Sequence, residues 1–382
     1  ENGALTLASP QIRFVLDSES QKPQDAEMYQ LKEANGMVEE FMLLANISVA
    51  KRILRSFPSF AILRRHPKPS ETQFDMLVRA AAVKGLKIDA RSNKALGESL
   101  DRCVIKGFPY FNTLIRVLAT RCMTQAVYFS SGSVEEQEYQ HYGLATPIYT
   151  HFTSPIRRYS DILVHRLLAA ALRIDPVPTA LENEEKSRSM CEHMNHRNRM
   201  AQQVGRSSSA LYTLLYFRDR DVIEEGIVLS VRKNGIRVFL PKFGIEGSIA
   251  VVRGGGGEAE AAVAGGPITE DSDDNGGWKF DPENLVLAHN QSQTRYQIFD
   301  RLKIRVYVKS SEMRREWLEM EIPESEAKTT TTIQQQQKHK KNKEEENKNL
   351  RKRGHQLGGD MDLDDDAGDD ISAAVPKGRV AK

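Results

Sequence analysis

The chain has 382 residues, with 54 lysines and arginines against 52 aspartates and glutamates, and its net charge is +2. This near balance excludes a globally basic surface, so any nucleic-acid-binding surface must be local. The hydrophobic share of 40% and the charged share of 28% fit a soluble globular protein with some disordered sequence. The length predicts two or three domains.

The cysteine pattern argues for a reducing compartment. Cys103, Cys122 and Cys191 are odd in number and far apart, which speaks against a disulfide framework. No apolar run approaches the roughly 20 residues that a membrane helix needs, and no signal peptide is visible. Because the chain does not begin with Met, we expect residue 1 to lie in the middle of a longer protein.

The first 60 residues predict strands followed by a long helix. Residues 3–16 read as one or two strands broken at Ser9-Pro10, residues 17–26 as a polar link, and residues 27–57 as a helix. Residues 41–50 are apolar nearly all round, which predicts burial in a large core. Glu39 and Asn46 lie two turns apart on one face of this helix. They form either a strip that faces water or a polar line into a binding channel.

The next stretch predicts a basic turn and several helices. Residues 63–67 read as a basic turn ended by proline. Shorter helices are expected at 72–84, 93–103 and 109–129. Asn93 is a plausible cap for the second of them. The third carries a probable core face made of Phe111, Leu114, Leu118 and Cys122.

Residues 149–161, YTHFTSPIRRYSD, are the most informative stretch. Ser154 reads as a helix N-cap and Pro155 as the first helical residue. The apolar face of this helix would then contain Ile156, Tyr159, Leu163 and Leu167. Arg157 and Arg158 would add positive charge where helical N–H groups already favour an anion, and Asp161 would hold the guanidinium of Arg157. The pattern is therefore either a phosphate site or an exposed Arg–Asp pair without a ligand.

Residues 180–218 predict another long helix, made basic by several arginines. Cys191, His193 and His196 are tempting metal ligands. However, positions 191 and 193 face different ways on a helix, and structural zinc requires four converging ligands. We therefore predict no metal site here.

From residue 222 short alternating runs replace helices, at 222–231, 236–240, 245–251, 302–309 and 316–322. Asn234-Gly235 is a strong hairpin signal. Five such strands suit a small barrel of the oligonucleotide-binding type, which binds single strands through basic grooves and stacking aromatics. The candidates are Phe239, Phe243, Arg232, Lys233 and Lys242. Core phenylalanines with solvated lysines are the equally good alternative.

The remaining sequence is of low complexity. The barrel is interrupted by residues 252–299, whose first part predicts a disordered loop that Trp278 and Phe280 tack down again. The tail 323–382 contains a basic block at 338–353 and an acidic block at 360–370. The basic block suits nuclear import, RNA contact or a plain solvated tail.

The stretch 149–161, together with MVEEFMLLAN at 37–46 and GALTLASP at 3–10, resembles the ribonuclease II (RNB) family. Within it, the members that serve as catalytic subunit of the eukaryotic RNA exosome are the most similar. The resemblance implies an α+β fold: the C-terminal portion of an RNB domain at 1–220, helix-rich with a mixed sheet, an all-β oligonucleotide-binding barrel at 221–322 with a disordered insertion at 252–299, and a disordered charged tail at 323–382.

The resemblance also implies a processive 3′→5′ exoribonuclease that hydrolyses single-stranded RNA with Mg²⁺. By position, Arg157 would clamp the scissile phosphate as the catalytic residue, Glu39 would contact a ribose, and Leu7 would pack on a terminal base. Ser154 and Arg158 would join the RNA contacts, as would Lys233 and Lys242 in the barrel. Gln202 stands where bacterial members carry a glutamate, and no role carries over to it.

One departure matters for activity: the family's aspartate cluster and its stacking tyrosine lie N-terminal to everything in this chain. Aspartates within 271–274 and 360–370 sit in low-complexity sequence and make poor substitutes, because a metal cluster must be held rigidly. We therefore expect the Mg²⁺ ligands upstream and the chain alone to be inactive. The alternative is a catalytically inactive RNA-binding fragment or pseudo-enzyme. The resemblance also implies exosome core subunits as partners, no membrane, and a nuclear and nucleolar location, with the cytoplasm as a further option.

Overall fold

The computed structural model describes residues 3–7, 12–19, 23–28, 32–251, 277–292, 294–311 and 315–323, which form an α+β fold as expected. The α-helices are α1 (Glu33–Ser56), α2 (Asp75–Val83), α3 (Asn93–Arg102), α4 (Phe111–Arg121), α5 (Tyr159–Ala171), α6 (Thr179–Glu182) and α7 (Glu184–Phe217). Short 3₁₀ helices are η1 (Glu71–Phe74), η2 (Ser131–Ser133), η3 (Glu136–Glu138) and η4 (Tyr142–Leu144). The strands are β1 (Ile12–Leu16), β2 (Pro23–Met28), β3 (Ile62–Arg65), β4 (Val127–Ser130), β5 (Val222–Arg232), β6 (Gly235–Leu240), β7 (Ile245–Ala250), β8 (Trp278–Asp281), β9 (Val286–His289), β10 (Arg295–Gln297), β11 (Arg301–Ser310) and β12 (Glu316–Glu321).

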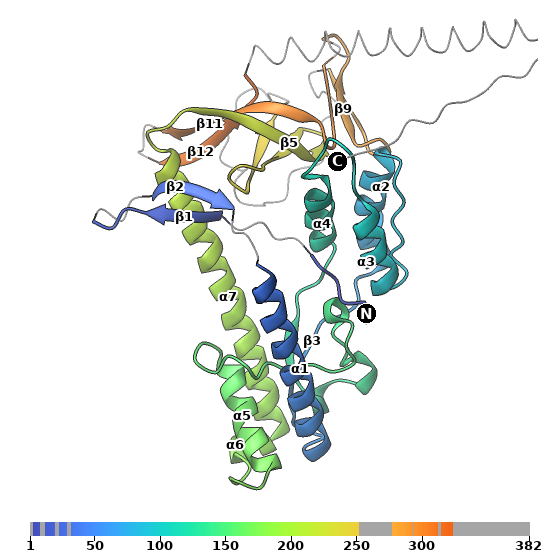
Figure 1. Cartoon of the computed structure of the whole chain (residues 1–382), viewed down its shortest axis with the longest axis vertical. Coiled ribbons are helices and arrows are strands. Elements are labelled where there is room, and N and C mark those ends of the chain that lie inside the picture. Colours follow the sequence, from blue (N-terminus) through green and yellow to red (C-terminus); the bar gives the residue numbers. More distant parts are fainter. Residues whose placement is uncertain are drawn as a thin grey trace, which may run out of the picture. The chain divides into compact units, whose positions relative to one another are not determined.

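Helices α1, α5 and α7 pack around the short two-stranded antiparallel sheet β3–β4 (Figure 1). Their shared core includes Ile53 of α1, Leu63 of β3 and Leu167 of α5, each fully buried. Burying such a side chain stabilises a fold by about 1.5–3 kcal/mol. The predicted turn at residues 63–67 is thus partly wrong. Residues 62–65 form β3, because Ile62 and Leu63 supply apolar side chains to this core.

The free edge of β4 is closed by one side chain of α7. Asn195 accepts a hydrogen bond from the backbone N–H of Tyr128 at 2.7 Å and donates one to its carbonyl oxygen at 2.8 Å. An asparagine amide therefore pairs with β4 as a neighbouring strand would. This contact ties the long helix to the two-stranded sheet β3–β4.

The first half of α1 contradicts the prediction of a buried apolar segment. Residues 32–41 are all exposed, and Phe41 and Leu44 keep 67% and 63% of their surface open to solvent. Burial begins at Asn46 and continues at Val49, Ala50 and Ile53. The burial predicted from the apolar composition is therefore found in the second half of the helix only.

Several local predictions near the termini of elements were also wrong. The expected polar link at 17–26 contains the start of β2, which pairs antiparallel with β1, while residues 3–7 form no strand. The cap of α3 is Ser92, whose hydroxyl accepts from the N–H of Ala95, and Asn93 is the first helical residue. The predicted core face of α4 is confirmed, since Phe111, Leu114, Leu118 and Cys122 are buried.

The five predicted barrel strands form one curled antiparallel sheet in the order β12-β11-β5-β6-β7. The β5–β6 turn contains Lys233 and Asn234, and Gly235 already pairs with Arg232. Glycine is needed there for another reason: a Cβ atom would lie 2.3 Å from the carbonyl oxygen of Ile249 on β7. Gly247 of β7 and Met320 of β12 are in close contact, so the two outer strands approach each other as the sheet curls.

The prediction of a disordered insertion at 252–299 is wrong for its second part. Residues 278–281, 286–289 and 295–297 form a three-stranded antiparallel sheet, β10-β9-β8. Trp278 stacks on Tyr296 with ring centroids 5.8 Å apart, consistent with the expected anchoring role of the tryptophan. Residues 252–276 and the tail from 324 lie outside the described residues.

The outer face of β5 and β6 packs against the helices α2–α4. Phe239 is fully buried in one cluster with Phe111 and Leu114 of α4, and Phe111 meets Phe299 with ring centroids 4.9 Å apart. At the rim of this contact Arg121 of α4 forms an ion pair with Glu246 of β7. The sheet and these helices therefore share one continuous core.

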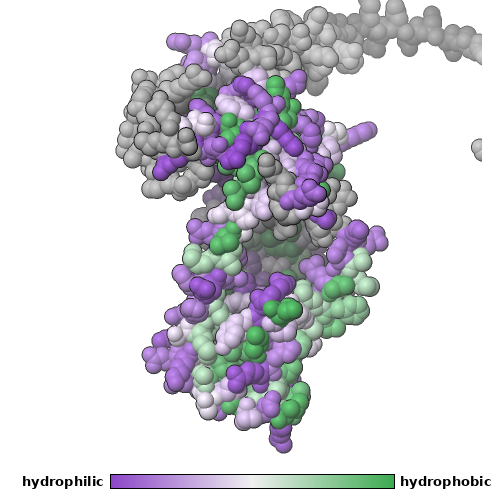
Figure 2. All heavy atoms as spheres, turned by 90° about the vertical axis from the view of Figure 1, so that its left-hand side faces the viewer, coloured by the Kyte–Doolittle hydropathy of each residue, from purple (hydrophilic) through white to green (hydrophobic). Residues whose placement is uncertain are grey.

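Figure 2 shows one face of the molecule, where hydrophobic and hydrophilic side chains are interspersed over the helical part. Exposed apolar residues on α7 are Met200, Val204 and Leu211. Among the described residues, none of the helices combines the length and apolarity that crossing a membrane requires.

The Asn195 clamp yields a stability prediction. Asn195→Ala leaves the N–H and the carbonyl of Tyr128 unpaired in a half-buried place, and each unpaired group costs about 1–3 kcal/mol. We expect urea denaturation to show a loss of about 2 kcal/mol. The exposed neighbour Arg197→Ala is the control and should change little. Equal small losses for both variants would contradict the clamp.

Candidate nucleic-acid interface

The segment 154–158 is a tight turn that precedes α5. The backbone N–H groups of Arg157 and Arg158 both donate to the carbonyl oxygen of Ser154, at 3.2 and 3.1 Å. Helix α5 begins at Tyr159, and its N-cap is Arg158. The predicted cap at Ser154 and helical start at Pro155 are therefore wrong. Ser154 closes a turn in front of the helix instead.

Asp161, in the first turn of α5, holds this turn in place through hydrogen bonds. Its carboxylate is fully buried and accepts from the N–H of Ser154 at 2.8 Å and from Ser160 Oγ at 3.0 Å. Arg158 donates twice, through Nε at 2.9 Å and Nη2 at 2.8 Å. Burial alone would raise the pKa of Asp161, but the hydrogen bonds from Arg158, the Ser154 N–H and Ser160 outweigh it and lower the pKa.

The partner of Asp161 is Arg158 and not Arg157, which corrects the expected pairing. The side chain of Arg158 is only 19% exposed, and its predicted RNA contact stays a prediction. Arg157 lies at the tip of the turn beside Ile156, which is 96% exposed. Ile156 and Tyr159 are thus absent from the predicted apolar face, whereas Leu163 and Leu167 are buried.

Within the described part of the chain, the side chain of Arg157 is exposed and forms no ion pair. One arginine of the pair is thus used for structure, and the other presents its charge to solvent on a fixed turn. This arrangement suits an incoming anion, because a guanidinium binds phosphate bidentately. Its predicted catalytic role is compatible with this geometry and remains a prediction.

Asn46 joins α1 to the strand-like segment before the turn. Its amide nitrogen donates to Tyr149 Oη at 3.0 Å, and its oxygen accepts from the N–H of Phe152 at 2.9 Å. Asn46 is fully buried, so it belongs to no solvent-facing strip. Glu39, two helical turns before Asn46, is exposed. Leu7 is half-buried and packs against the α2–α4 core. Their predicted RNA contacts stay predictions.

Neutral histidines lie next to the turn. Burial, followed by the nearby charges of Arg64 and Arg158, lowers the pKa of His151 to about 3. Burial, His66 and Arg64 lower the pKa of His141 to about 3 as well. Tyr128 Oη lies 2.7 Å from His151 Nδ1. At neutral pH these rings carry no charge, so the positive charge beside the turn comes from arginine.

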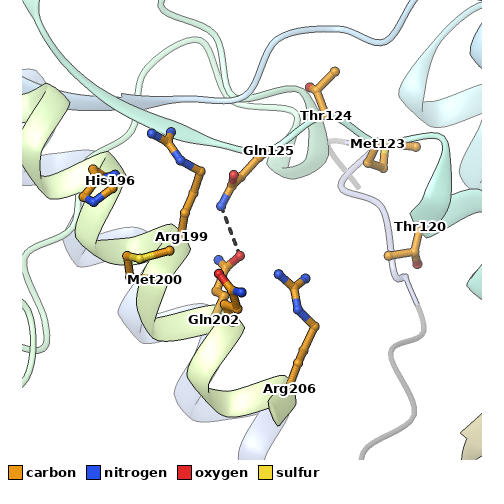
Figure 3. A pocket seen from close by; sticks show the side chains of 10 residues that line it. Thr120, Met123, Thr124, Gln125, His196, Arg199, Met200, Gln202 and Arg206 are labelled. Carbon is orange, nitrogen blue, oxygen red and sulfur yellow. Dashed lines mark hydrogen bonds between the residues drawn. The ribbon is translucent and has the colours of Figure 1, made fainter. Parts of the chain in front are cut away.

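A cleft of about 780 Å³ lies between α7 and residues 120–125 (Figure 3). Its lining consists of Thr120, Met123, Thr124, Gln125, His196, Arg199, Met200, Gln202, Gln203 and Arg206. Gln125 donates to the amide oxygen of Gln202 at 3.1 Å, and Gln202 donates to Asn198 at 3.0 Å.

The chemistry of this cleft suits a polyanion with sugar hydroxyls. No carboxylate lines it, and neither Arg199 nor Arg206 forms an ion pair with another described residue. Two cations and three amides can bind phosphate and hydroxyl groups together. The sequence analysis did not identify this cleft. The available signal was the spacing of Asn195, Arg199, Gln202 and Arg206, which places them on one face of α7.

The barrel candidates separate into core and surface. Phe239 and Phe243 are 0% and 2% exposed, so the core alternative holds for both and stacking on bases is excluded in this state. Lys242 forms an ion pair with Glu224. Lys233 is exposed in the β5–β6 turn, which is one of the loops with which such barrels usually bind oligonucleotides. The RNA contacts of both lysines stay predictions.

The described residues offer no group of three or more His, Cys, Asp or Glu side chains arranged for a metal. His193 and His196 are exposed, while Cys191 is buried and burial raises its pKa to about 12. The aspartates at 271–274 and 360–370 lie outside the described residues. The residues in view therefore do not fit a Mg²⁺ centre.

Comparisons with known proteins agree with this architecture. Residues 1–174 match the RNB domain, and residues 222–320 match the S1 domain. Among curated relatives, the exosome complex exonuclease RRP44 homolog A of Arabidopsis thaliana is 49% identical over 308 residues, covering 81% of this chain and 31% of the relative. The exosome complex exonuclease RRP44 of Homo sapiens is 43% identical over 325 residues, covering 85% and 32%. The chain thus spans about a third of these relatives.

Solved structures share the fold at low sequence identity. RNase R of Mycoplasma genitalium, in complex with ribose-methylated single-stranded RNA, superposes with a TM-score of 0.65 at 22% identity, over 84% of this chain and 46% of that one. Yeast Ssd1, a pseudonuclease, gives 0.59 at 19% identity, over 75% and 44%.

These matches define the class of protein. Residues 1–174 belong to the RNB family, and an S1 domain follows them. The curated relatives at 43–53% identity are named exosome complex exonucleases, and the similarity falls on their C-terminal part.

The anchored turn predicts a pH dependence. Because folding lowers the pKa of Asp161, its contribution to stability is complete above pH 4 and is lost as the pH falls through the folded-state pKa. Asp161→Asn removes one partner of a buried pair, which costs about 3 kcal/mol. We expect chemical denaturation to show this loss at pH 7 and a smaller one at pH 2. A loss of the same size at both pH values would contradict the assignment.

Proposed function

We propose that this chain is the C-terminal part of a 3′→5′ exoribonuclease that hydrolyses single-stranded RNA. The observation that carries the proposal is the Asp161-anchored turn, which presents Arg157 within a domain of the RNB family. The family relationship supports the reaction class, and the turn supplies a residue suited to the reacting phosphate.

The chemistry of Arg157 follows from its charge. Hydrolysis of a phosphodiester builds negative charge on the phosphoryl oxygens, and a fixed guanidinium stabilises that charge more than it stabilises the ground state. The turn is held by Asp161, so Arg157 needs little reorganisation when substrate arrives. Arg158 contributes by fixing the turn, since its own guanidinium is already neutralised.

The α7 cleft supports single-stranded RNA as the ligand. Arg199 and Arg206 suit phosphates, while Gln125 and Gln202 suit ribose hydroxyls, which distinguish RNA from DNA. At Gln202 an amide replaces the glutamate of bacterial members, and it both donates and accepts.

Mg²⁺ is proposed as the cofactor, because RNB exonucleases are generally metal-dependent. When bound, such an ion lowers the pKa of water and neutralises phosphate charge. The described residues do not supply its ligands. We further propose association with exosome core subunits, a part in RNA processing and decay that includes rRNA processing, and a location in the nucleus and nucleolus, with the cytoplasm as a further location.

A chimera tests the enzymatic proposal. This chain replaces the matching C-terminal part of the plant relative, and release of mononucleotides from a single-stranded RNA is followed with Mg²⁺. Arg157→Ala should lower kcat by about 10²–10³-fold, because it removes transition-state charge stabilisation, and should raise KM much less. Arg166→Ala on the exposed side of α5 is the control. Equal changes in kcat and KM would make Arg157 an ordinary backbone contact.

The purified chain tests which candidate function applies to it alone. We expect it to bind single-stranded RNA in fluorescence anisotropy, with an affinity that falls as salt rises. We also expect it to release no mononucleotides with Mg²⁺ or Mn²⁺. Metal-dependent release by the chain itself would refute the expectation that its metal ligands lie elsewhere.

A further inference from the structure

Arg64 on β3 lies beside the turn and has no anionic partner among the described residues. It pairs with Tyr128 of β4 in the two-stranded sheet, and its Cζ atom lies 4.6 Å from the centroid of the Tyr128 ring. Its backbone N–H donates to the carbonyl oxygen of Tyr149 at 2.8 Å. This hydrogen bond fixes Arg64 against the segment that leads into Ser154.

The arginines next to Arg64 form ion pairs with carboxylates. Arg65, the next residue on β3, lies 2.5 Å from a carboxylate oxygen of Glu138, and Arg158 is held by Asp161. Arg64 forms no ion pair with any carboxylate in the described ranges. The carboxylate of Asp161 already accepts four hydrogen bonds from other groups.

The surroundings of Arg64 make this charge costly. Arg64 is half-buried, and burial lowers its pKa, opposed by Tyr128 and Tyr149 and reinforced by the positive charge of Arg158. A guanidinium does not lose its proton in a protein, so the charge persists. His141 and His151 are neutral at pH 7 and offer no compensation. A half-buried cation without an anion destabilises the free protein, and a bound anion would remove that cost.

We propose that Arg64 is a phosphate-binding residue for the backbone of single-stranded RNA, next to the contact made by Arg157. The guanidinium of Arg64 lies over the ring of Tyr128, and a guanidinium binds phosphate oxygens through its fork of N–H groups. This inference rests on the proposed RNA-binding function. The competing explanation is a purely structural cation–π contact with Tyr128.

The two explanations predict opposite changes in stability. Arg64→Met keeps an unbranched apolar stem on Tyr128 and removes the charge. If Arg64 is a phosphate-binding residue, Arg64→Met without RNA should melt about 2–4 °C higher than the wild type. Its affinity for a single-stranded RNA should fall about 10-fold. A structural cation–π contact predicts a lower melting temperature and unchanged affinity, and this result overturns the proposal.

Arg65→Met is the matched control. It removes the adjacent arginine but leaves Glu138 without its partner, so the melting temperature should fall while RNA affinity stays the same. Arg64→Lys keeps the charge but not the fork, and should retain part of the affinity. It serves as the second variant if Arg64→Met does not fold, and an RNA affinity equal to that of the wild type in Arg64→Lys would then overturn the proposal.

Inorganic phosphate separates this inference from the proposed function. Phosphate should raise the melting temperature of the wild type and not of Arg64→Met. If the wild type binds RNA but Arg64→Met binds it equally well, only the inference fails. If the wild type responds to phosphate but not to RNA, the proposed function fails and the anion site stands. A wild type that responds to neither overturns both.

Discussion

The position of Arg157 depends on the buried carboxylate of Asp161. That group accepts hydrogen bonds from the backbone of Ser154, from Ser160 and from Arg158, so one charge fixes the start of α5 and the turn in front of it. Burial of a carboxylate is tolerated only when its oxygens are satisfied. Here their satisfaction requires the turn to be closed. The exposed arginine is thus positioned by an interaction that it does not itself make.

The same region is tied to the rest of the domain through polar side chains acting on backbone groups. Asn46 connects α1 to Phe152, and Asn195 connects α7 to β4. Further along α7, the face that carries Asn195 continues through Arg199 and Gln202 into the cleft. One helix therefore secures the β3–β4 sheet that contains Arg64 and also lines the surface that suits RNA. A shift of α7 would disturb both.

The sequence was most informative where a motif or a simple alternation controls structure. It predicted the five sheet strands and the buried side of α4. It failed where partners distant in sequence decide. Ser154 does not cap the helix, because its N–H donates to Asp161 and its carbonyl oxygen closes a turn in front of α5. The arginine that reaches Asp161 is Arg158 and not Arg157. Nor does any local pattern reveal that Arg65 pairs with Glu138 while Arg64 pairs with no carboxylate of the described residues.

The exposed apolar residues of α1 show that composition alone does not determine burial. Its composition predicts burial, but burial requires a neighbour, and Phe41 has none among the described residues. The S1 domain shows the opposite outcome. Phe239 lies on the outer face of the strands that barrels of this type commonly use for their ligands, and α4 covers it.

This covered face changes what kind of module the S1 domain is. A domain linked only by a tether can be exchanged, lost or duplicated without harm to its neighbour. Here Phe239 of the barrel packs in one buried cluster with Phe111 and Leu114 of α4, so substitutions on the barrel and on α4 must accommodate one another. The two parts are expected to evolve, and to tolerate engineering, as a single body.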